Sequence, residues 1–169
     1  MTIAETARGA PPAAPRHIGL RTGLAALAAL ELLDAMMRVQ LLLPDYQHPT
    51  SFVQALTGVY LALAPLVSGA ALLFAAIGRV RQAVLALALL ILLTWLLHGI
   101  WSIHGSGLPW ANGNPLLQLF IFPAAAIAAA ALAVKNRRLA IAGLLVSAPT
   151  IYGWVPMVIF TIGVLIYGF

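Results

Sequence analysis

Three ionisable residues lie in the middle of an apolar segment that is long enough to cross a membrane. Glu31, Asp34 and Arg38 fall within the apolar run of residues 20–43. Each would cost about 2.5–3.5 kcal/mol if it faced lipid at the bilayer centre. Steps of three and four residues place them on one narrow stripe of a helix, with Arg38 one turn beyond Asp34 as a counter-charge. We expect this stripe to face other helices or a polar cavity, and the rest of the chain to shelter it from lipid.

The composition identifies an integral membrane protein. Of 169 residues, 63% are hydrophobic and 8% are charged, and the mean hydropathy is +1.02. A soluble domain carries about 25% charged residues. Because the chain has no cysteine, disulfides, thiolate metal ligands and cysteine-ligated iron–sulfur clusters are excluded. The net charge of +5 is interpreted as a topology signal, and no nucleic-acid partner is expected.

The apolar segments predict an all-α bundle of five transmembrane helices in one domain. Residues 1–17 are rich in Pro, Ala and polar residues and are expected to form a flexible tail before the helical domain of residues 18–169. The predicted spans are about 20–43, 52–77, 82–103, 116–134 and 139–169.

The last segment is too long for one straight crossing. At 1.5 Å per residue it would reach about 45 Å, against a hydrocarbon core of about 30 Å. Pro149 and Pro156 favour one long helix that is kinked at its prolines. A re-entrant piece around residues 147–156 is the alternative.

The basic residues predict the orientation of the bundle. In a five-span topology every Lys and Arg except Arg38 falls on the side of the N-terminus; these are Arg8, Arg16, Arg21, Arg79, Arg81, Lys135, Arg137 and Arg138. The positive-inside rule then places the N-terminus in the cytoplasm and the C-terminus in the periplasm of a bacterial-type inner membrane.

Polar and aromatic residues converge in the outer half of the predicted bundle. Trp95, His98 and Trp101 lie on one face of the third span, which could pack on the charged stripe of the first. His98 would then be the partner of Asp34 or Glu31, and such a pair can relay protons, orient a substrate carbonyl or bind a metal. A histidine that only joins two helices by a hydrogen bond is the alternative. The predicted ligand-binding residues are Glu31, Asp34, Arg38, Trp95, His98 and Trp101.

A metal site is a further alternative. Asp34, His98 and His104 supply nitrogen and oxygen ligands that zinc, copper or iron accept. The two histidines differ by about 120° around a helix, so a single ion would require the helix to end between them.

The order of elements resembles the DoxX-like small membrane proteins. The resemblance covers residues 20–134 and rests on their layout: about four spans, a Pro-containing outer loop after the first, and a short G-x-x-R connection between the second and third. That connection is read here in the sequence GAALLFAAIGRVRQA at residues 69–83. The fifth span departs from the pattern. The resemblance implies an accessory or quinone-linked subunit of a membrane oxidoreductase system, and no catalytic residue is carried over from it.

These observations predict a small subunit or binding protein of a larger membrane assembly, redox systems included. Its pocket on the periplasmic side would hold a quinone, a lipid or a similar amphiphile. One alternative is a membrane enzyme in which Glu31 or Asp34 acts as general acid or base with His98 on a lipophilic substrate. Another is a structural subunit whose charged stripe is satisfied by a partner chain. The expected partners are the lipid bilayer and other membrane subunits or a second copy of the chain.

Overall fold

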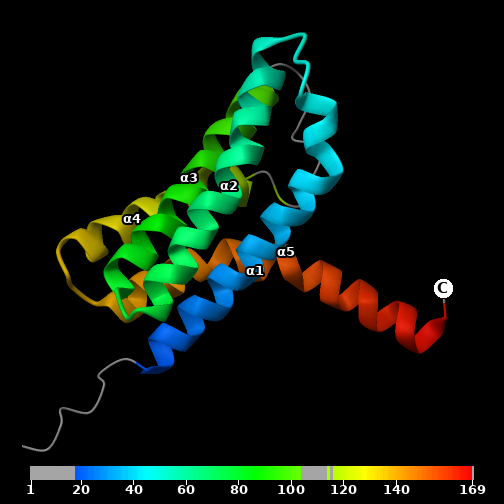
Figure 1. The fold of residues 1–169 in the computed structure, drawn as a ribbon. Coiled ribbons are helices and arrows are strands. Elements are labelled where there is room, and N and C mark those ends of the chain that lie inside the picture. Colours follow the sequence, from blue (N-terminus) through cyan, green and yellow to red (C-terminus); the bar gives the residue numbers. More distant parts are fainter. Residues whose placement is uncertain (1–17, 104–113, 115, 169) are drawn as a thin grey trace, which may run out of the picture.

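The protein is an all-helical bundle. The computed structural model describes residues 18–103, 114 and 116–168, and all regular structure in that part of the chain is helical (Figure 1). The elements are α1 (Ile18–Leu42), the 3-10 turn η1 (Leu43–Tyr46), α2 (Phe52–Ala76), α3 (Val80–Ile103), the π-helical turn η2 (Leu117–Ile121), α4 (Phe122–Val134) and α5 (Leu139–Tyr167). The all-α prediction is confirmed, and the five long helices correspond to the five apolar segments of the sequence.

Four of the described helical segments are long and apolar enough to cross a membrane. They are α2, α3, the continuous segment Leu117–Val134 and α5. The first helix, α1, does not belong to this group, since its 25 residues include two arginines and two acids. Its length of about 37 Å still exceeds the hydrocarbon core of a bilayer. A lipid bilayer is therefore the environment that the described helices fit.

Each helix packs against the next one along the chain, and small residues allow close contact. Ala28, Ala83 and Ala126 have no exposed surface, and they belong to one core cluster built from several helices. Gly143 on α5 lies so close to Leu20 on α1 that an added Cβ would stand 2.8 Å from Leu20 Cδ1. Close backbone approach at small residues is the usual basis of helix association in membranes.

The turn between α2 and α3 is fixed by the first helix. Gly78 adopts φ = +81°, a conformation that glycine reaches without strain. Arg21 on α1 donates a hydrogen bond of 2.5 Å from Nη2 to the carbonyl oxygen of Ala76 at the end of α2. This contact satisfies one of the carbonyl groups that a helix C-terminus leaves without an intrahelical partner.

The two parts of α5 differ in their surroundings. Its first part packs into the bundle and buries Ala142, Gly143, Val146 and Thr150. Beyond Thr150 no described residue is buried, and this part of the helix runs away from the bundle toward the C-terminus (Figure 1). Residues 147–156 are helical throughout, which contradicts a re-entrant loop at this position.

Candidate functional site

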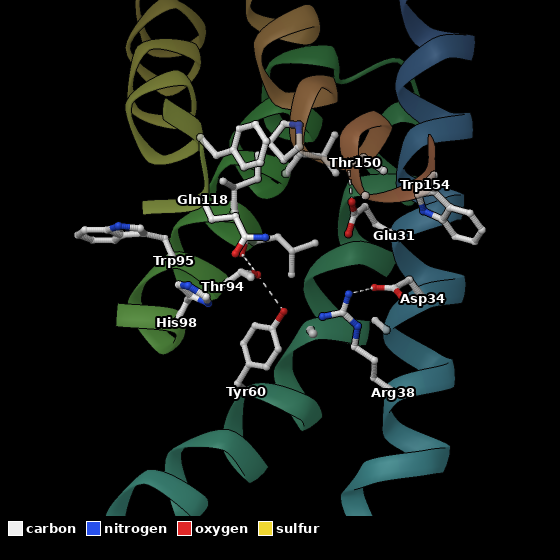
Figure 2. Close-up of a pocket in the computed structure, with 18 of the residues that line it drawn as sticks. Glu31, Asp34, Arg38, Tyr60, Thr94, Trp95, His98, Gln118, Thr150 and Trp154 are labelled. Carbon is white, nitrogen blue, oxygen red and sulfur yellow. Dashed lines mark hydrogen bonds and ion pairs between the residues drawn. The ribbon is translucent and has the colours of Figure 1, made fainter. Parts of the chain in front are cut away.

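A cavity of about 520 Å³ lies among α1, α2, α3, η2 and α5. Its volume is in the range of small-molecule binding pockets. Figure 2 shows the α1 residues on one side and the α3 residues on the other, with Tyr60 of α2 between them. The charged, polar and aromatic lining residues are Glu31, Asp34, Arg38, Tyr60, Thr94, Trp95, His98, Gln118, Phe122, Thr150, Tyr152 and Trp154. The remaining lining is mostly aliphatic, so the cavity offers both polar and apolar surface.

The α1 wall is the charged stripe that the sequence predicted. Glu31, Asp34 and Arg38 all line the cavity. Arg38 Nη2 lies 2.5 Å from Asp34 Oδ2, one helical turn away, and about a third of each side chain is exposed. Glu31 instead accepts a hydrogen bond of 2.5 Å from the hydroxyl of Thr150 on α5. The stripe therefore faces the cavity, and the fifth helix contacts it at Glu31.

The α3 wall contains a hydrogen-bond chain that reaches α2. Tyr60 Oη lies 2.9 Å from Thr94 Oγ1, and Thr94 Oγ1 donates to the carbonyl oxygen of Leu90 at 2.9 Å. Because a hydroxyl group has a single hydrogen, Tyr60 is the donor to Thr94. The Tyr60 oxygen keeps its lone pairs as acceptors.

Two further lining residues, Trp95 and Gln118, lie where α3 meets the π-helical turn η2. The Trp95 indole donates 2.9 Å to the carbonyl oxygen of Leu119, which ties α3 to the π-helical turn η2. That turn also carries Gln118, another lining residue. Such π turns interrupt regular helices and frequently occur at functional sites.

His98 is buried in the α3 wall with an unsatisfied ring nitrogen. The residue is 8% exposed, it lines the cavity, and its Nδ1 has no hydrogen-bond partner. No hydrogen bond joins His98 to Glu31 or Asp34, whose contacts in the described chain are with Thr150 and Arg38. His98 and the two acids share one cavity without forming the direct pair that we expected.

Trp101, the sixth residue of the predicted site, does not line the cavity. Its indole donates a 2.9 Å hydrogen bond to Thr57 Oγ1 on α2, and its ring packs against the core cluster that contains Leu61 and Leu97. Trp101 lies one turn beyond His98 and shares its face of α3, but α2 covers this face at the position of Trp101.

The described residues offer little to a metal ion. They contain no group of three His, Cys, Asp or Glu side chains that could hold a metal ion. His104, a member of the predicted metal set, lies outside the described residues. The metal hypothesis retains only Asp34 and His98 in this part of the chain.

Several polar residues of the cavity lie outside the predicted ligand-binding set. Tyr60, Thr94, Gln118 and Thr150 line it from α2, α3, η2 and α5. Each is a hydrogen-bonding residue within an apolar segment, which is the signal that could have identified them.

No family model matches this chain, and no curated protein or solved structure matches it. The fold and the cavity define its class: a helical membrane protein with a partly polar cavity among its helices.

Proposed function

We propose that this protein binds an amphiphile, such as a quinone or a lipid, in the cavity between α1 and α3. The observation that carries this proposal is a single cavity of about 520 Å³ whose lining combines charged and polar side chains with many aliphatic ones. A polar headgroup would bond to side chains such as Glu31, Tyr60 and His98. Its tail would lie along lining residues such as Leu87 and Ile91, where burial of apolar surface is favourable.

The proposal includes a five-span topology in which α1 also crosses the membrane. Support comes from the length of α1 and from the orientation of its charges toward the cavity. The distribution of basic residues supports a cytoplasmic N-terminus, a periplasmic C-terminus and a bacterial-type inner membrane. Pro149 and Pro156 are the places where α5 would bend, since each removes a backbone hydrogen bond.

This topology has a direct test because the chain contains no cysteine. A single cysteine introduced as Asp45→Cys should react with an impermeant thiol reagent on intact bacterial cells. Arg79→Cys should react only after the inner membrane is opened. The reverse pattern would overturn the orientation, and labelling of both variants from outside would overturn the crossing of α2, the helix that separates the two positions.

We further propose that the protein works as a subunit of a larger membrane assembly or as a self-associating chain. The apolar, unburied part of α5 beyond Thr150 supports this, since it offers surface to lipid or to another subunit. A redox assembly is the version that the resemblance to DoxX-like proteins implies.

The test of amphiphile binding is purification from native membranes followed by native mass spectrometry and organic extraction. One equivalent of an amphiphile with a defined mass is expected to remain bound after exchange into a second detergent. A protein that retains nothing, and also binds no added quinone, lipid or long-chain amine, would overturn the proposal.

A membrane enzyme is the second candidate function. It is favoured by His98, which lines a cavity that also contains two carboxylates, because an imidazole and a carboxylate are a common acid–base combination. Conversion of the extracted amphiphile to a product of different mass by the wild-type protein, and not by His98→Ala, would establish catalysis. An unchanged amphiphile would leave binding as the function.

A further inference from the structure

The cavity carries an excess of acidic side chains. Glu31 and Asp34 are its acidic lining residues, and Arg38 is its basic one. The Asp34 carboxylate is paired with the Arg38 guanidinium at 2.5 Å, whereas the hydrogen bond of Glu31 comes from a neutral hydroxyl. When both acids are ionised, the lining carries a net charge of −1, because Arg38 balances only one of the two carboxylates. An enclosed charge is costly unless a counter-charge accompanies it.

The hydrogen-bond pattern of the wall points the same way. The hydroxyl hydrogens of Thr150 and Thr94 are donated to Glu31 and to the carbonyl oxygen of Leu90. The Tyr60 hydrogen is used on Thr94, and the indole of Trp95 bonds a backbone carbonyl. These four donors are already used within the protein, and the other donors of the lining include the guanidinium of Arg38 and the amide of Gln118. The second oxygen of Glu31 and the lone pairs of Tyr60 remain as acceptors for a ligand that donates.

His98 is a buried polar residue of the same lining. Its side chain is more than nine-tenths buried, and Nδ1 has no partner in the described chain although His98 lines the cavity. Buried polar atoms are nearly always bonded to protein, water or ligand.

We infer that the bound amphiphile has a cationic amine headgroup, and this inference rests on the proposed function. An ammonium group supplies the missing positive charge and up to three hydrogen-bond donors. The aromatic rings of Tyr60 and Trp154 in the lining are surfaces that a cation favours. A quinone brings no positive charge to the cavity, and a fatty acid carboxylate would add a second unbalanced negative charge.

The test compares headgroups on one tail. The full-length protein in phosphatidylcholine nanodiscs is titrated at neutral pH with radiolabelled decylamine, decanol, decanoate and a decyl-substituted benzoquinone, and each result is corrected with empty nanodiscs. A charge-assisted hydrogen bond predicts that decylamine binds about tenfold or more tightly than decanol. The variant Glu31→Gln should lose this preference. Asp45→Asn removes a carboxylate from the exposed turn η1 and should retain it.

Every outcome decides between the two proposals. If the quinone, decanol or decanoate binds as tightly as decylamine, the inference is overturned while amphiphile binding stands. If no chain binds above empty nanodiscs, both fail. If Glu31→Gln does not fold, as judged by gel filtration and circular dichroism, the ranking of the four ligands on the wild-type protein still decides the matter.

Discussion

The hydroxyl of Thr150 on α5 donates a 2.5 Å hydrogen bond to Glu31 Oε1 on α1, across 119 positions of the chain. Figure 2 shows this contact at the edge of the cavity, next to the Asp34–Arg38 pair. It joins Glu31, an ionisable residue within the first helix, to Thr150, the last buried residue of the fifth helix. The acid in α1 and the docking of α5 therefore depend on one another.

Thr150→Val should destabilise the bundle because it removes the donor to the partly buried carboxylate of Glu31. We expect a loss of about 1–2 kcal/mol in the free energy of unfolding, measured by unfolding in detergent micelles. Thr161→Val is the matched control, since Thr161 bonds only back to Met157 in the exposed part of α5. Its effect should stay within about 0.5 kcal/mol. Equal effects of the two substitutions would show that the contact with Glu31 contributes nothing.

The Asp34–Arg38 pair should behave as one unit. Asp34→Asn and Arg38→Gln each remove one charge of an ion pair that lines the cavity, and each leaves the other charge without this counter-ion. The double variant should therefore be less destabilised than the sum of the two single variants, with a coupling of about 0.5–3 kcal/mol. Thermal unfolding of the four proteins measures this coupling. Strict additivity would mean that the pair is incidental.

Trp101→Phe separates stability from ligand binding. The change keeps the packed ring but removes the indole donor to Thr57, so we expect a loss of about 1 kcal/mol in stability. Because Trp101 does not line the cavity, the affinity for a decyl-chain amphiphile should stay unchanged. A weakened affinity in a variant of normal stability would show that Trp101 is a ligand-binding residue, as the sequence predicted.

The helices were predictable because hydropathy and length fix them. The run that ends before Pro44, the Gly78 turn and the basic connection after Val134 separate the apolar segments clearly, and α1 to α5 begin and end close to the expected positions. The charged stripe was also predictable, since three ionisable residues at helical spacing must share one sheltered face.

The partners of the stripe were not predictable in the same way. The depth of the residues in their spans suggested His98 as the partner of Glu31, but the hydrogen bond comes from Thr150. Thr150 follows Pro149, and sequence periodicity does not define the course of the helix beyond this proline. Trp101 shares the helical face of His98, but tertiary packing against Thr57 decides its surroundings. The π-helical turn that carries Gln118 has no sequence signature that we could use.

The central claim is that an amphiphile occupies the cavity, and obstruction of the cavity tests it most directly. Gly153 on α5 lines the cavity, and a Cβ added there would meet nothing within 4 Å, so Gly153→Trp places a large ring at the site with little strain on the backbone. Gly163 has equally open surroundings but lies outside the lining, which makes Gly163→Trp the matched control.

The measurement is the amount of amphiphile bound per folded protein, by native mass spectrometry of the purified wild type and both variants. We predict about one equivalent on the wild type and on Gly163→Trp, because both keep the cavity open, and a loss of bound amphiphile on Gly153→Trp. Equal occupancy of all three proteins would contradict the cavity as the binding site.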